Sequence, residues 1–207
     1  MPSNYDNSAW FYDRLSRLVY GRQLINAHRF LIPYIPAGSR VLIVGGGTGY
    51  VLDEITQQHP AGLTITYVEI SARMMALARK RNTGNNKVLY ITSAIEQTEL
   101  SAYDVIFTPF LFDNFTQQQF EALFKQLHAC LVPGGVWLNA DFQLTGKWWQ
   151  PLLLKAMFTF FKLIGCVDVN RLPDIDRIFN IFNYQPVASK AFFGDFIGAT
   201  VYRITRY

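Results

Sequence analysis

The chain has 207 residues, of which 50% are hydrophobic, and it carries a formal net charge of +4. Charged residues make up only 16% of the chain, against roughly 25% in an average globular protein, and this balance excludes an intrinsically disordered chain. The length suits one domain with a sizeable core, so residues 1–207 are expected to fold as a single unit. The basic residues are scattered rather than gathered in a stripe, so no nucleic-acid partner is expected.

The sequence also bears on the compartment. Cys130 and Cys166 lie far apart without metal-ligand spacing, so no metal site is expected. Residues 1–6 are polar, and the most apolar stretch, residues 152–164, is interrupted by two lysines and is too short to span a bilayer. A soluble, cytoplasmic protein without a transmembrane segment is therefore expected.

The pattern of apolar residues predicts helices in the N-terminal part of the chain. Apolar residues recur at helical spacing over residues 8–34, with a break at Gly21, and Pro36 and Gly38 then end this segment. We interpret residues 1–37 as a helical cap on the domain. From there strands and helices alternate, which is typical of a parallel sheet covered on both faces.

The alternation gives five strands before a change of rhythm. They are expected at residues 41–44, 63–69, 88–92, 104–107 and 136–142. Helices between them are expected at residues 50–59, at residues 71–82 after the cap Ser71, and from Thr116 to about residue 131, where Thr116 and Gln119 form a capping box. Pro133, Gly134 and Gly135 are expected to separate that last helix from the fifth strand.

The C-terminal part differs from this pattern. Residues 144–185 predict a helical insertion rich in aromatic residues, and Gly194-Asp195 between apolar runs predicts a hairpin. The expected fold class is therefore α/β, with a seven-stranded, mostly parallel sheet, a C-terminal antiparallel hairpin and helices on both faces.

A glycine-rich segment is the most informative local feature. Gly45, Gly46, Gly47 and Gly49 follow a buried strand and open a helix, which lets the chain turn sharply and lets a ligand approach the backbone. The dinucleotide fingerprint G-x-G-x-x-G fails because Tyr50 stands where the third glycine is needed. A nicotinamide-dependent oxidoreductase is therefore the less favoured alternative.

An acidic residue follows at a suitable distance. Glu69 lies twenty residues beyond Gly49, at the end of the second strand. A carboxylate there can accept hydrogen bonds from both ribose hydroxyls of an adenosine. The alternative is that Glu69 caps the helix that begins after Ser71.

Four segments together resemble the motif series of class I S-adenosylmethionine-dependent methyltransferases. They are VLIVGGGTG at 41–49, YVEIS at 67–71, YDVIFTPF at 103–110 and LVPGG at 131–135. The resemblance covers about residues 40–141, and residues 5–15 are similar to the opening of small-molecule members. It implies a Rossmann-like methyltransferase fold with S-adenosylmethionine as the cofactor.

The resemblance also implies roles for single residues. Gly45, Gly47 and Gly49 would shape the loop on the methionine side, and Glu69 would hold the ribose. The remaining cofactor contacts implied are Ile70 on the adenine, Ser93 and Ala94 at its amino edge, and Phe110 beside the transferred methyl group.

The sequence departs from the family at two positions. Ile43 and Ser93 stand where members usually carry an acid. A serine hydroxyl can still accept a hydrogen bond, but a charge-assisted bond is lost. These departures motivate an alternative function, an adenosine-ligand binding module without turnover.

Two polar residues are candidates for chemistry. Asp113 follows the fourth strand at the expected catalytic edge and is the candidate general base. The competing interpretation is that it helps to cap the helix near Thr116. His28 lies on an apolar helical face and is interpreted as a core histidine with satisfied hydrogen bonds.

The helical insertion is expected to roof the acceptor site. Residues 152–161 are apolar over most of the helix circumference and need a partner, which is an apolar acceptor, a second subunit or a membrane surface. Tyr12, Trp148 and Trp149 are the expected substrate-pocket residues. The alternative for this helix is that it is simply buried in a thick core. The expected function is methyl transfer to a small, apolar or lipid-like acceptor. A homodimer and a peripheral contact with a membrane are both left open.

Overall fold

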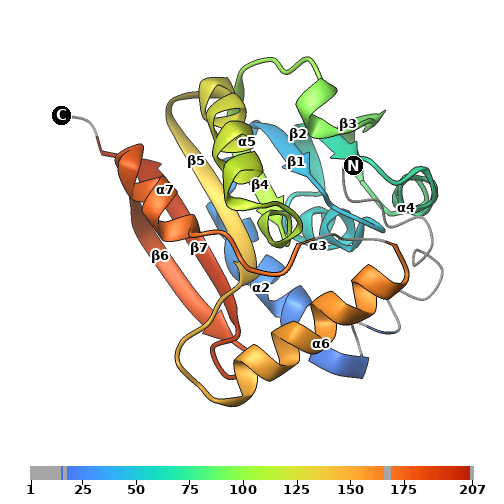
Figure 1. The fold of residues 1–207 in the computed structure, drawn as a ribbon. Coiled ribbons are helices and arrows are strands. Elements are labelled where there is room, and N and C mark those ends of the chain that lie inside the picture. Colours follow the sequence, from blue (N-terminus) through green and yellow to red (C-terminus); the bar gives the residue numbers. More distant parts are fainter. Residues whose placement is uncertain (1–14, 16–17, 166–168, 206–207) are drawn as a thin grey trace.

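The computed structural model describes residue 15 and residues 18–165 and 169–205. Its sheet has seven strands in the order β3-β2-β1-β4-β5-β7-β6 (Figure 1). The strands are β1 (Arg40–Val44), β2 (Ala61–Glu69), β3 (Asn85–Thr92), β4 (Tyr103–Pro109), β5 (Leu131–Phe142), β6 (Tyr184–Phe192) and β7 (Ile197–Ile204).

The centre of the sheet is parallel because its strands are buried on both faces. β1 pairs in parallel with β2 on one side and with β4 on the other. Its residues Val41–Val44 are all buried, as the continuous apolar run of the sequence predicts. Strand β7 runs antiparallel to both β5 and β6, with Gly194 and Asp195 in left-handed conformation at the turn. The expected fold class, including the C-terminal hairpin, is confirmed.

Helices cover both faces of the sheet. The α-helices are α2 (Gln23–Leu31), α3 (Tyr50–Gln58), α4 (Ala72–Ala78), α5 (Gln117–Cys130), α6 (Trp149–Leu163) and α7 (Ile175–Ile181), with 3-10 helices η1 (Ile32–Tyr34), η2 (Ile95–Gln97) and η3 (Phe112–Asn114). Alternate residues of each strand face opposite layers: Ile43 and Phe107 pack with α2 and α3, whereas Leu42, Ile106 and Trp137 pack with α5 and α7. Figure 1 shows α5 and α7 on the near face and α6 crossing the lower edge.

Local capping signals place several helix starts. The Thr116 hydroxyl accepts from the Gln119 backbone N–H, and the Gln119 side chain accepts from the Thr116 N–H, so the expected capping box is confirmed. The Ser71 hydroxyl accepts from the Met74 N–H and caps α4 in the same way. Gly21 has a positive φ of 59° just before α2, which confirms the expected break.

Two boundaries differ from the sequence expectation. Strand β5 begins at Leu131, so Pro133 and its two glycines lie inside the strand rather than before it. The pairing of β5 with β4 shifts register between Tyr103 and Val105. This irregularity accommodates Pro133, which has no N–H to donate to the neighbouring strand. The helical insertion consists of two separate helices, α6 and α7.

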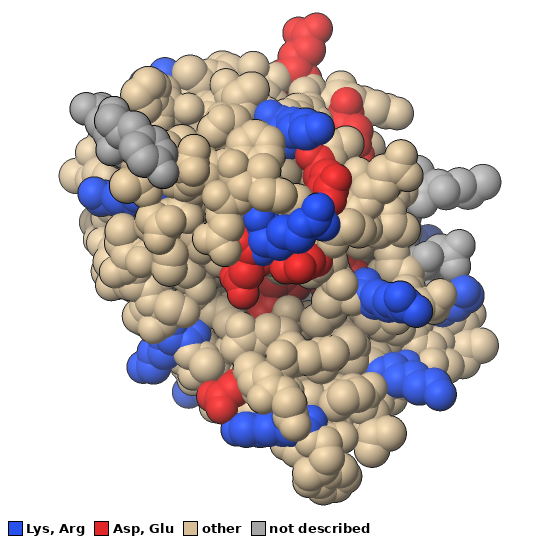
Figure 2. All heavy atoms as spheres, turned by 60° about the vertical axis from the view of Figure 1, so that its left-hand side comes forward, with Lys and Arg blue, Asp and Glu red and all other residues tan. Residues whose placement is uncertain are grey.

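The charged side chains are interspersed on the surface turned forward in Figure 2. Acidic residues gather near the middle of this face, and Lys and Arg stand among wide uncharged areas. Within the described part of the chain, no helix has the length and apolar character needed to cross a membrane.

Candidate functional site

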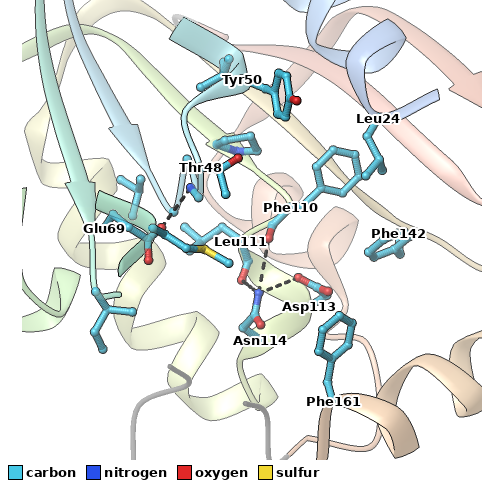
Figure 3. Close-up of a pocket in the computed structure, with 18 of the residues that line it drawn as sticks. Leu24, Thr48, Tyr50, Glu69, Phe110, Leu111, Asp113, Asn114, Phe142 and Phe161 are labelled. Atoms are coloured by element: carbon cyan, nitrogen blue, oxygen red, sulfur yellow. Dashed lines mark hydrogen bonds between the residues drawn. The ribbon is translucent and has the colours of Figure 1, made fainter. Parts of the chain in front are cut away.

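A cavity of about 350 Å³ opens at the carboxyl ends of the parallel strands, between α2 and α6. In open α/β sheets this edge borders the ligand crevice. The cavity brings together nine residues expected from the sequence: Gly45, Gly46, Gly47, Glu69, Ile70, Ser93, Ala94, Phe110 and Asp113. In Figure 3, Glu69 lies on one side of the view, and Phe110, Phe142, Asp113 and Phe161 lie on the other.

Glycine is required at the positions of the loop after β1 for different physical reasons. Gly45 and Gly47 have positive φ angles of 70° and 60°, a conformation that other residues adopt only with strain. A Cβ on Gly46 would collide with the ring of buried Tyr67, and a Cβ on Gly49 would lie 2.8 Å from the Ala78 Cα. Gly49 therefore serves the packing of the loop on α4 and does not line the cavity.

Glu69 connects the glycine loop to the start of α4. It is 5% exposed, its Oε2 accepts from the Gly47 N–H at 3.0 Å, and its Oε1 accepts from the Ser71 N–H at 2.8 Å. A carboxylate oxygen can accept more than one hydrogen bond, and the Glu69 side chain also lines the cavity. Glu69 thus contacts the helix start, as the alternative interpretation held, and also faces the cavity.

The conformation of the glycine loop is stabilised by hydrogen bonds that do not involve an acid at position 43. Ile43 is fully buried in the apolar core and does not line the cavity. The Tyr67 hydroxyl instead donates to the Gly47 carbonyl at 3.0 Å, opposite the bond from the Gly47 N–H to Glu69. The Ser93 hydroxyl donates to the Ala94 carbonyl at 3.1 Å, which leaves its oxygen lone pairs available as acceptors.

Phe110 forms the aromatic wall in a strained conformation. Its φ of 54° is unusual for a bulky residue, and such strain often marks functional sites. The Phe110 N–H donates to the Ala140 carbonyl at 2.7 Å, and its carbonyl accepts from the Asn114 Nδ2 at 3.3 Å. Its ring centroid lies 5.3 Å from that of Phe142 and 5.7 Å from that of His28.

Asp113 lies in the cavity wall and does not cap α5. That helix is capped by Thr116 and Gln119, whereas the Asp113 Oδ1 accepts from the Asn114 Nδ2 at 2.8 Å (Figure 3). Burial raises the pKa of the Asp113 carboxyl well above its usual range, and the neighbouring Asp141 raises this pKa further. The structure therefore places a carboxyl that readily holds a proton beside Phe110.

The sequence reasoning missed Asp141. This residue is the penultimate one of β5, is 3% exposed, and accepts from the Phe112 N–H and the Phe142 N–H, both at 2.9 Å. Burial raises the pKa of Asp141 to about 7, although hydrogen bonds from Phe142 and Phe112 oppose the shift. The sequence did contain a signal for this residue, because Asp141 is an acid near the end of a mostly apolar strand, at the expected catalytic edge of the sheet.

The expectation of a satisfied core histidine at position 28 is wrong in one respect. His28 is buried, with 8% exposure, but within the described residues neither ring nitrogen has a hydrogen-bond partner. The side chain lines the cavity, and burial lowers its pKa to about 4. Helical periodicity places His28 on the inward face, and only the packing reveals that this face borders a cavity.

Helix α6 roofs the cavity, although with other residues than the two tryptophans. The residues of α6 that line it are Leu153, Ala156, Met157, Phe160 and Phe161. Trp148 is 80% exposed, and Trp149 packs on Phe193 and Phe196 at the hairpin, so neither lines this cavity. The reason is that the first turn of α6 lies against the β6–β7 turn. The remaining expected pocket residue, Tyr12, lies outside the described residues.

Comparisons with known proteins agree with this architecture. A family model described as a methyltransferase domain matches residues 41–135. The ubiquinone/menaquinone biosynthesis C-methyltransferase UbiE of Rubrivivax gelatinosus is 27% identical over 161 residues, which are 77% of this chain and 62% of that protein. The chain thus spans less than two thirds of the length of this curated relative.

Solved structures share the fold over nearly the whole chain. The mitomycin 7-O-methyltransferase MmcR superposes with a TM-score of 0.68 at 14% identity, covering 96% of this chain and 58% of that chain. The magnesium protoporphyrin IX methyltransferase of Synechocystis, solved with bound S-adenosylhomocysteine, has a TM-score of 0.66 at 15% identity, covering 97% and 96% of the two chains.

Proposed function

We propose that this chain, a class I S-adenosylmethionine-dependent methyltransferase by its fold and family match, methylates a small apolar acceptor. The observation that carries the proposal is the single cavity that joins the glycine loop and Glu69 to an aromatic wall under α6. One side of this cavity has the groups that an adenosine needs, and the other has the apolar surface that the acceptor needs.

The residues on the polar side fit the cofactor. The carboxylate of Glu69 suits the ribose hydroxyls, and Gly45 and Gly47 line the part of the cavity that the methionine portion would take. Ile70 and Ser93 border the position that the adenine would take. When bound, S-adenosylmethionine supplies an electrophilic methyl group on a cationic sulfonium.

The opposite side suits an apolar acceptor. Leu24, Phe110, Phe142 and Phe161 face this part of the cavity. The Rubrivivax gelatinosus relative is named for ubiquinone and menaquinone biosynthesis, which is in line with an apolar acceptor. Because methyl transfer is a displacement, these walls contribute mainly by holding the acceptor in line.

Asp113 is the residue we assign to proton transfer. It lines the cavity next to Phe110, and its carboxyl is buried. A cation close to a carboxyl favours the ionised form, so the sulfonium would lower the pKa of Asp113 and leave it able to accept a proton from the acceptor. Asp141 acts through position, since its bonds to the Phe112 and Phe142 N–H groups hold the segment that carries Asp113.

Ligand-induced changes in melting temperature test the proposal. Saturating S-adenosylhomocysteine at a hundred times its dissociation constant stabilises a protein by about 2.7 kcal/mol, which raises the melting temperature of a domain of this size by about 5–10 °C. NAD should leave the melting temperature unchanged. The variant Glu69→Ala should lose most of the shift, because a hydrogen bond to a charged group contributes about 1.5–3 kcal/mol.

The matched control is Glu99→Ala, an exposed glutamate that does not line the cavity and whose variant should keep the full shift. A shift with NAD, or no shift with S-adenosylhomocysteine, would contradict the proposal. Binding of S-adenosylhomocysteine together with an absence of methyl transfer to any apolar acceptor would favour a binding module without turnover.

A further inference from the structure

His28 is a buried polar side chain that lines the cavity. It projects from α2, is 8% exposed, and neither Nδ1 nor Nε2 has a hydrogen-bond partner within the described part of the chain. A buried polar group that lacks a partner is costly, and such groups are rare in folded proteins. An orphaned side chain that lines a cavity therefore points to a group on the ligand.

The surroundings of His28 keep its ring neutral. The ring meets Phe107 edge-on, with centroids 5.8 Å apart, and lies 5.7 Å from the Phe110 ring. These aromatic neighbours offer no carboxylate to stabilise a charged imidazole, and burial lowers the pKa of His28 to about 4. A neutral imidazole presents one N–H donor and one nitrogen that accepts a hydrogen bond.

His28 lies on the acceptor side of the cavity. Phe110 connects it to Phe142, since the Phe110 ring contacts both side chains. Glu69, which we assign to the ribose, is on the opposite side from Phe110 and Phe142 (Figure 3). His28 and Asp113 are thus polar groups on a side of the cavity that is lined mainly by aromatic and aliphatic side chains.

We propose that His28 binds a hydroxyl group on an apolar skeleton, so that the acceptor is an apolar hydroxyl compound such as a phenol or an enol. This inference rests on the proposed function, which makes this side of the cavity the acceptor site. A pure hydrocarbon would leave both ring nitrogens of His28 unpaired. A carboxylate ligand is disfavoured because a neutral imidazole supplies no compensating charge in this buried position.

Two probes of similar size test the inference. Equilibrium dialysis measures the binding of β-naphthol and of naphthalene, which lacks the hydroxyl, with and without saturating S-adenosylhomocysteine. In His28→Phe, the affinity for β-naphthol should fall about three- to tenfold relative to that for naphthalene, as expected for the loss of one neutral hydrogen bond. Binding of naphthalene and S-adenosylhomocysteine should persist, which also shows that the variant is folded.

Further variants separate recognition from general packing. His28→Gln, which keeps a donor and an acceptor, should retain part of the preference for β-naphthol. His128→Phe, on α5 and outside the cavity, should keep the full preference. If His28→Phe does not fold, the same loss of preference is expected in His28→Leu.

Several results would overturn the inference. They are an unchanged ratio of the two probe affinities in the His28 variants, a loss of S-adenosylhomocysteine binding in place of β-naphthol binding, and failure of the wild type to bind either probe. Failure of the wild type to bind S-adenosylhomocysteine would overturn the proposed function instead. In that case the probe ratio in the ligand-free protein still decides the role of His28.

Discussion

At the scale of single residues, Gly47 provides a test of the glycine loop. Its φ is 60°, and a Cβ there would meet only the Met74 Sδ, at 3.7 Å, so a larger side chain would extend into the cavity. Gly47→Val should abolish detectable S-adenosylhomocysteine binding by calorimetry and cost about 1–3 kcal/mol of stability through backbone strain. Gly38→Val is the matched control, because Gly38 has a φ of 75°, has open space around its Cβ and does not line the cavity. Normal binding by Gly47→Val would place the cofactor elsewhere.

Asp113 provides a second test at this scale, which measures the protons released when a ligand binds. Because burial and Asp141 raise its pKa, this carboxyl holds a proton more readily than an exposed one, and a nearby sulfonium cation should favour release of that proton. Calorimetry in buffers of different ionisation enthalpy should show up to about one more proton released with S-adenosylmethionine than with S-adenosylhomocysteine, whose sulfur carries no charge. Asp113→Asn should remove this difference, and Asp195→Asn, a hairpin variant outside the cavity, should keep it. Equal proton release by both ligands in the wild type would argue against a position of Asp113 near the sulfonium.

At the scale of elements, α6 separates a cavity face from a solvent face. Phe161 lines the cavity, whereas Leu163 on the same helix is 81% exposed. Phe161→Ser should weaken the binding of naphthalene by about tenfold, since it removes apolar contact area, and should spare S-adenosylhomocysteine. Leu163→Ser should leave both unchanged. Joint loss of cofactor binding and stability in Phe161→Ser would identify this part of α6 as core, and a change of oligomeric state in Leu163→Ser would identify an interface.

At the scale of the whole molecule, buried titratable groups make stability depend on pH in two opposite directions. His28 has a pKa of about 4 in the fold and about 6.5 when unfolded, so the unfolded chain binds more protons between these values and stability falls as the pH drops. The carboxyl of Asp141, with its pKa raised to about 7, acts in the opposite sense, and its contribution is lost as the pH rises through that value.

Variants resolve these opposing contributions. Urea unfolding at about pH 7 and about pH 4.5 should show that His28→Phe escapes part of the acid destabilisation seen in the wild type, by up to about 3 kcal/mol. His128→Phe should have a smaller effect, because the pKa of His128 is also lowered by burial but the ring is only partly buried. An identical pH dependence in wild type and His28→Phe would show that His28 has a partner that keeps its pKa near the ordinary value.

The sequence by itself determined the features of this protein that depend on residues close to one another along the chain. The caps at Ser71 and Thr116, the break at Gly21 and the hairpin at Gly194 all follow from hydrogen bonds or φ angles within a few residues. The α/β fold class and the position of the glycine loop after the first strand followed from the alternation of apolar patterns, because a parallel sheet buries its central strands on both faces. The order of the strands in the sheet came only from the structure.

Only the tertiary structure decided what meets across the cavity. Asp141 accepts from Phe112, which is 29 positions away. Burial raises the pKa of both Asp141 and Asp113, and the neighbouring Asp141 raises the pKa of Asp113 further. Among the described residues His28 has no hydrogen-bond partner, because its ring packs against the rings of Phe107 and Phe110. Trp149 turns to the hairpin because the first turn of α6 lies there. Periodicity tells which face of an element is apolar, but contacts between residues distant in sequence determine whether that face meets core, cavity or solvent.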